Sequence, residues 1–147
     1  MSPSDVDDAI LWRSRSTSAW EALARTALVR RRGHLVVREP RGWRAVPLWP
    51  FSQVLHTAAL VGAVEAPALR DALEAYRRGT AYAERPGSRR RYYDDNAWIA
   101  LALLAHGDPE GAARVLDLLR EGCVDLPSGA VGVRWVEGGD ALHACST

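Results

Sequence analysis

Lysine is missing from this sequence of 147 residues, so all 19 of its basic residues are arginine. They stand against 18 acidic residues, which gives a formal net charge of +1. A chain so close to neutrality exerts no overall electrostatic attraction on nucleic acids or anionic membranes. We therefore expect neither nucleic acid nor membrane as a partner.

Cysteine is also scarce, because Cys123 and Cys145 are the only two and their spacing does not match a metal site. We predict free thiols, with a disulfide between them as the alternative in an oxidising compartment. No stretch approaches the roughly 20 uninterrupted apolar residues of a transmembrane helix. Residues 1–8 are polar and acidic, unlike a secretory signal peptide, which predicts a cytoplasmic protein unless the true start lies upstream.

What the sequence does contain is a helical period. Ser18 and Glu21 form a capping box ahead of an apolar face, and Gly33 suits the end of that helix. This predicts a polar N-terminal extension over residues 1–17 and a domain over residues 18–147.

Further helices are predicted from proline and capping signals. Pro50 and Pro67 suit the first turns of two helices, and Asp108 with Pro109 suits the start of another that ends at Gly122. Between them, residues 97–105 are nine consecutive apolar residues, which predicts a helix buried on all sides.

Two segments interrupt this pattern, residues 34–49 and 126–140, and both are predicted to be extended because proline, glycine and β-branched residues break them up. Residues 141–147 resemble the start of a sixth helix. The order of elements predicts an all-α fold of stacked helical pairs, of the kind found in bundles, solenoids and toroids.

Two adjacent acids, Asp94 and Asp95, precede the longest apolar run. One aspartate is a favoured helix start, since its charge suits the positive end of the helix dipole. A second adds like-charge repulsion, and two carboxylates at one site tend to separate in pKa. That division suits glycoside hydrolysis, in which one carboxylate attacks and the other protonates the leaving group. Adjacent side chains diverge by about 100° on a regular helix, so we expect the pair at or before the first turn.

The segment YYDDNAWIALALL, residues 92–104, resembles the signature of glycoside hydrolase family 76, the endo-α-1,6-mannanases and their bacterial relatives. The resemblance lies in a tyrosine-rich lead, two consecutive aspartates and a tryptophan three residues later. Three other segments resemble this family in the same order: LWPFSQVL (48–55), GAVGVRW (129–135) and ACST (144–147). His143 stands where the family has asparagine.

This resemblance implies an (α/α)6 toroid with the catalytic pair in a central groove. It implies Asp94 as the nucleophile and Asp95 as the general acid/base of a retaining reaction on α-1,6-linked mannan or mannosides, with the carboxyl groups about 5 Å apart. No metal or organic cofactor is expected. The aromatic and amide side chains implied to contact the oligo- or polysaccharide are Trp49, Gln53, Tyr93, Trp98 and Trp135.

A complete toroid has six helical hairpins, whereas this sequence predicts about half that number. We therefore expect an incomplete barrel whose C-terminal half is missing, with a large apolar surface left uncovered. The alternative hypothesis is an inactive helical fragment or a carbohydrate-binding or interaction module. The sequence does not distinguish mannose from its epimers.

Overall fold

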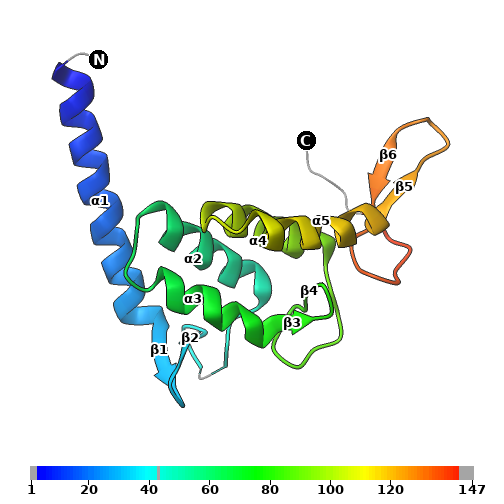
Figure 1. Ribbon diagram of the computed structural model, residues 1–147, viewed down its shortest axis with the longest axis horizontal. Helices are drawn as coiled ribbons and strands as arrows, with labels where there is room; N and C mark the ends of the chain where they lie inside the picture. The colour runs from blue at the N-terminus through cyan, green and yellow to red at the C-terminus, as the bar shows by residue number, and fades with distance from the viewer. Residues whose placement is uncertain (1–2, 43, 143–147) are drawn as a thin grey trace.

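The computed structural model describes residues 3–42 and 44–142, with side chains from residue 8 onward. These residues form five α-helices and three two-stranded antiparallel hairpins (Figure 1). The helices are α1 (Pro3–Ala27), α2 (Leu48–Leu60), α3 (Ala66–Ala72), α4 (Tyr93–Ala105) and α5 (Pro109–Gly122), and a 3-10 helix, η1 (Leu73–Tyr76), continues α3. The strands are β1 (Leu28–Arg31), β2 (His34–Val37), β3 (Arg77–Arg78), β4 (Ala81–Tyr82), β5 (Cys123–Asp125) and β6 (Val131–Val133), paired in chain order.

The four central helices form two antiparallel pairs, α2 with α3 and α4 with α5 (Figure 1). Helices α2 and α4 pack side by side and run in the same direction. At one end, the backbone N–H of Leu48 donates to the carbonyl of Glu84, in the loop that leads to α4, at 2.8 Å. At the other, a ring nitrogen of His106, just after α4, lies 2.9 Å from the carbonyl oxygen of Leu55 in α2. The two antiparallel pairs are thus stacked so that α2 of one and α4 of the other run parallel.

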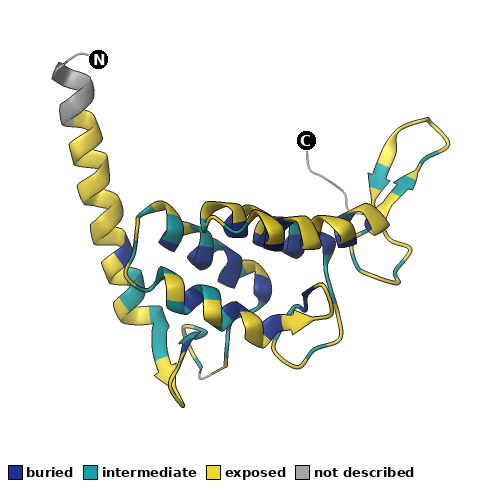
Figure 2. Cartoon of the chain, in the orientation of Figure 1, coloured by how far each residue is buried: buried dark blue, intermediate teal, exposed yellow. Residues whose placement is uncertain are grey.

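One main hydrophobic core lies between α2, α3 and α4. Its large apolar side chains that are at most 1% exposed include Leu48, Phe51, Leu55, Leu69, Leu73, Ile99 and Leu103. Helix α1 joins this core near its end, where Trp20 is buried and its indole N–H donates to the Glu65 carboxylate at 3.1 Å. Residues 8–19 of α1 are all exposed, so this half of the helix extends away from the core (Figure 2).

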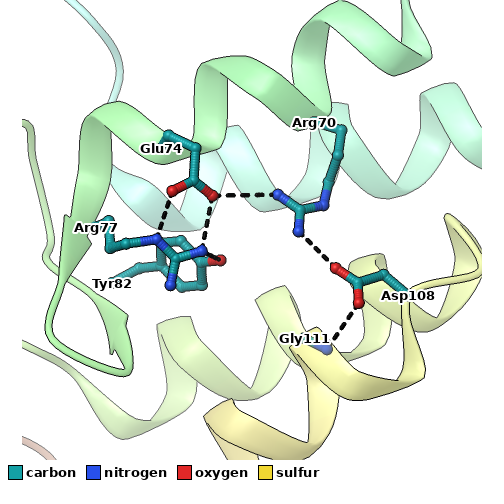
Figure 3. A network of polar contacts seen from close by, with 6 residues as sticks. All are labelled: Arg70, Glu74, Arg77, Tyr82, Asp108 and Gly111. Atoms are coloured by element: carbon teal, nitrogen blue, oxygen red, sulfur yellow. Dashed lines mark hydrogen bonds and ion pairs between the residues drawn. The ribbon is translucent and has the colours of Figure 1, made fainter.

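A network of polar contacts connects the two helical pairs (Figure 3). Arg70 on α3 forms ion pairs with both Glu74 and Asp108, and Asp108 also accepts a hydrogen bond from the Gly111 backbone at 2.7 Å. Asp108 therefore starts α5 and attaches it to α3 through the same carboxylate. The predicted start of this helix at Asp108 and its end at Gly122 are confirmed.

The prediction for the first helix is wrong at both ends. It begins at Pro3 and crosses the boundary placed between residues 17 and 18, so Ser18 lies inside the helix and does not cap it. No glycine or proline interrupts residues 4–27, and proline is well suited to the first helical turn. The helix ends at Ala27 rather than Gly33, because residues 28–31 pair as a strand with residues 34–37. Arg32 and Gly33 form the two-residue turn with φ of 49° and 85°, as a type I′ hairpin requires.

The fold is mostly helical, but the three hairpins make it a mixture of helices and strands rather than all-α. The helices predicted near Pro50 and Pro67 are confirmed. The extended segments are confirmed in part: short strands, bridges and turns occupy residues 34–42, 44–47 and 126–140, but Leu48 and Trp49 already belong to α2. Helix α4 is not buried on all sides, since Trp98, Leu101 and Leu104 are 39%, 48% and 52% exposed. Only α2 and α5 among the described elements pack extensively along it, which leaves a third side open. The predicted sixth helix falls mainly on residues 143–147, outside the described residues.

No helix in the described part of the chain is long and apolar enough to cross a membrane.

Candidate active site

The two aspartates occupy the first turn of α4. The helix begins at Tyr93, and Tyr92 precedes it in an extended conformation, so Asp94 and Asp95 are the second and third helical residues. The prediction that the pair sits at or before the first turn is confirmed. The pair therefore stands in the turn where backbone N–H groups have no partner within the helix, at the positive end of the helix dipole.

Asp95 is the unusual member of the pair. Its residue is only 9% exposed, and its pKa is raised from the ordinary 3.8 to about 7. Burial away from water is the largest cause, followed by the negative charges of Asp94 and Glu84. All three effects disfavour the charged carboxylate. At neutral pH Asp95 is therefore divided between its protonated and ionised forms, which is the condition that a general acid/base needs.

Asn96, the next residue, is fully buried and holds the start of α4 in place. Its side-chain oxygen accepts from the Tyr82 N–H at 3.0 Å, and its amide donates to the carbonyls of Tyr82 and Tyr92 at 2.9 and 2.8 Å. These bonds attach β4 to the first turn of α4. Asn96 was not among the predicted site residues, although a polar side chain at the head of an apolar run was a usable signal.

The glycine-rich segment after α5 returns to the start of α4. The Tyr93 N–H donates to the carbonyl of Trp135 at 3.1 Å, and the Trp135 ring centroid lies 5.6 Å from that of Tyr92. An ion pair between Arg91 and Glu137 links the same two segments. Trp135 is 48% exposed, so its ring and that of Tyr92 present an aromatic surface beside the first residue of α4.

Tyr93 itself lies in a different environment, because its residue is only 4% exposed and it packs in a small core cluster with Ala81 and Leu118. A methyl group added at Gly122 would come within 2.7 Å of its ring, which shows how closely α5 approaches. The ring that faces Trp135 is therefore that of Tyr92, whereas Tyr93 was the tyrosine predicted to contact substrate.

The other predicted contact residues lie on the surfaces of α2 and α4. Trp49, in the first turn of α2, is 52% exposed. Gln53, one turn later, is half-buried and donates to the Ser52 hydroxyl at 3.2 Å. Trp98 lies one turn after Asp94 and is 39% exposed, at the edge of the open side of α4. The structure thus brings Trp135 and Trp98 to the start of α4, while Trp49 and Gln53 lie on the neighbouring parallel helix.

Three surface cavities lie away from the aspartates, and neither Asp94 nor Asp95 lines any of them. One of about 350 Å³ lies between α1 and the turn from α2 to α3. A second of about 680 Å³ separates the β1–β2 hairpin from α3 and η1. The third, about 320 Å³, is an apolar groove between α4 and α5 whose walls include Leu101, Leu104 and Leu116.

Within residues 8–42 and 44–142, no group of three or more His, Cys, Asp or Glu side chains is placed to hold a metal ion. Cys123 is an exposed free thiol, and Cys145 lies outside the described residues.

Comparisons of the chain with family models, curated proteins and solved structures found no match. The geometry and electrostatics of α4, together with the sequence resemblance, are therefore the observations that bear on function.

Proposed function

We propose that this chain carries the catalytic carboxylate pair of a glycoside hydrolase-like domain that acts on α-1,6-linked mannan or mannosides with retention of configuration. The observation that carries the proposal is the buried Asp95, with a pKa of about 7, beside Asp94 in the first turn of α4. Retaining glycosidases need two neighbouring carboxyl groups, of which one holds a proton near neutral pH.

The roles follow from the two environments. Burial keeps a proton on Asp95, so this residue donates it to the oxygen of the leaving sugar. Asp94, less buried and nearer solvent, attacks the anomeric carbon and forms a glycosyl ester as the glycosidic bond breaks. Asp95, now ionised, then removes a proton from water, which attacks the anomeric carbon and releases Asp94. Tyr92 and Trp135 supply an aromatic surface on which a sugar ring can lie.

The arrangement of helices supports a larger toroid as the setting for this pair. Two antiparallel helical pairs are stacked with α2 and α4 parallel, as successive hairpins are in an (α/α)6 barrel. The side of α4 and α5 away from α2 is apolar and uncovered in the described structure. We propose that further hairpins of the same kind cover this face and build the opposite wall of the substrate groove.

Leaving-group chemistry tests the roles of the two carboxyl groups. The full 147-residue chain is assayed on α-1,6-mannobiose, whose leaving group needs protonation, and on an aryl α-mannoside with a strongly acidic phenol, which does not. Asp94→Asn should abolish both reactions. Asp95→Asn should abolish hydrolysis of the disaccharide. On the aryl mannoside it should keep a first-turnover burst of phenol, after which release slows because the same residue is the general base of the second step.

The matched control is Asp117→Asn, an exposed aspartate on α5 that pairs with Arg120. It should leave both activities unchanged. If the unmodified chain hydrolyses neither substrate faster than Asp94→Asn does, the enzymatic proposal fails for this polypeptide.

A second candidate, a helical interaction module, is favoured by the apolar groove between α4 and α5. Soluble monomers rarely expose large contiguous apolar patches, and such patches mark interaction sites. On this hypothesis the face binds a helical partner, and Leu104→Gln weakens that binding while the fold is kept. Light scattering on the chain and this variant measures self-association directly, and identical monomeric behaviour would exclude a second copy as that partner.

A further inference from the structure

The segment that follows β6 pairs with the residues that lead into α4, in a short antiparallel arrangement. The backbone N–H of Glu137 donates to the carbonyl of Arg91 at 3.0 Å, and the N–H of Tyr93 donates to the carbonyl of Trp135 at 3.1 Å. A pairing this short contributes little stability by itself. Contacts between side chains must therefore help to hold the two segments together.

The ion pair between Arg91 and Glu137 is the side-chain contact that does so. The Nε of Arg91 donates to one oxygen of the Glu137 carboxylate at 2.7 Å, and Nη2 donates to the other oxygen, so the pair is bidentate. The third nitrogen, Nη1, donates to the carbonyl of Arg78 in β3 at 3.2 Å. One guanidinium thus joins β3, the start of α4 and the segment after β6.

This ion pair is better protected from water than most pairs at a protein surface. The two side chains are 15% and 37% exposed, Arg91 being the less exposed. The hydrogen bonds from Arg91 hold the pKa of the Glu137 carboxyl below its usual range, so Glu137 stays ionised at neutral pH. Water and salt screen a partly buried pair less than an exposed one.

The ion pair stands next to the aromatic surface in both segments. Tyr92 directly follows Arg91, and Trp135 lies two residues before Glu137. The two aromatic ring centroids are 5.6 Å apart. Because Trp135 is 48% exposed, burial in the core does not fix its ring. Its place against Tyr92 depends on the backbone pairing and on the ion pair beside it.

We propose that Arg91 and Glu137 are positioning residues that hold Trp135 against Tyr92, so that the two rings bind one sugar ring of an α-1,6-linked manno-oligosaccharide. The affinity for the sugar then depends on the fraction of molecules in which the segment after β6 is docked. The choice of sugar rests on the proposed function. Binding itself requires no catalysis and can be measured without it.

A double-mutant cycle separates positioning from direct contact with the sugar. Glu137→Gln removes the charge that pairs with Arg91, and Trp135→Ala removes the aromatic ring. If Glu137 acts only through Trp135, the first change weakens binding when the ring is present and has no effect once the ring is gone. If the Glu137 carboxylate touches the sugar itself, its effect persists without the ring. Glu137→Asp keeps the charge and should retain most of the affinity.

The experiment is a calorimetric titration of the full chain with α-1,6-mannotriose. All variants carry Asp94→Asn, so that no hydrolysis occurs during the titration. Trp135→Ala should raise Kd by about tenfold. Glu137→Gln should raise Kd by about two- to fivefold, the range that one partly exposed ion pair can supply. Glu110→Gln, an exposed residue in the first turn of α5, is the control and should leave Kd unchanged.

Three results would overturn the proposal: Glu137→Gln binds mannotriose as tightly as the chain with Glu137, its effect is equally large with and without the Trp135 ring, or the chain with both residues does not bind mannotriose. The proposed function can fail separately. Binding with the expected cycle, in a chain that hydrolyses nothing when Asp94 is present, would support the positioning role and refute the enzymatic proposal. Hydrolysis of mannobiose together with a Kd unaffected by Glu137→Gln would do the reverse.

Discussion

The buried carboxyl of Asp95 should make the stability of this protein depend on pH in an unusual direction. Its folded-state pKa of about 7 lies above the ordinary value of 3.8, which we take for the unfolded chain. Between these two values the folded protein binds more protons than the unfolded chain, so the free energy of unfolding falls as pH rises. Most structural carboxylates, held by cations or N–H groups, have the opposite effect.

The size of this effect follows from the two pKa values. A difference from 3.8 to about 7 corresponds to a free energy on the order of 4 kcal/mol between pH 4 and pH 8. Native domains are stable by about 5–15 kcal/mol, so the loss is a large fraction of the total. Asp95→Asn is neutral at every pH and nearly the same size, so it removes this dependence and should stabilise the protein at pH 8.

Urea unfolding followed by circular dichroism, at whole pH values from 4 to 8, measures this directly. The quantity to compare is the difference in unfolding free energy between Asp95→Asn and the parent chain. We expect it to increase with pH and level off above pH 7. Asp117→Asn, an exposed control, should give a flat difference. A flat difference for Asp95→Asn as well would refute both the raised pKa and the general acid assigned from it.

Five other substitutions test the packing that supports the site. Asp108→Ala removes the cap of α5 and an ion pair, so it should lower the free energy of unfolding by about 2 kcal/mol at pH 7. The pKa of Asp108 is lowered by Arg70 and the Gly111 N–H. The stabilisation by Asp108 should therefore disappear as pH falls below about 4, which the same urea assay measures. Asn96→Ala leaves buried backbone groups without partners and should cost about 2–4 kcal/mol, seen as a lower Tm. Gly122→Ala would favour an isolated helix, but here it should destabilise the protein by about 1–3 kcal/mol, because the added methyl group would lie 2.7 Å from the Tyr93 ring. An unchanged urea midpoint would contradict this close approach. Leu103→Ala should lower the free energy of unfolding by about 3 kcal/mol and Leu104→Ala by much less, since these neighbours are 0% and 52% exposed. Equal Tm values for the two variants would refute the conclusion that one side of α4 is open.

Much of the helical framework was predictable from local signals. Pro50, Pro67 and the Asp108-Pro109 pair each mark a helix start through effects that act within one turn, namely a fixed φ and a capped N–H. The placement of Asp94 and Asp95 in a first turn was predictable for the same reason. The first helix was placed too late because a possible capping box does not stop a helix that already runs through it.

The properties of the candidate site were set instead by contacts between remote segments. The pKa of Asp95 is raised first by burial, which the packing of remote segments sets, and then by the negative charges of Asp94 and Glu84. The core position of Tyr93 depends on Gly122, 29 residues later in the chain.

The sequence alone therefore determined where most helices begin and that two carboxyl groups share one turn, because both depend on neighbouring residues. Only the tertiary structure decided which carboxyl is buried, which tyrosine faces Trp135 and which side of α4 stays open, because desolvation and packing depend on what the rest of the chain places there.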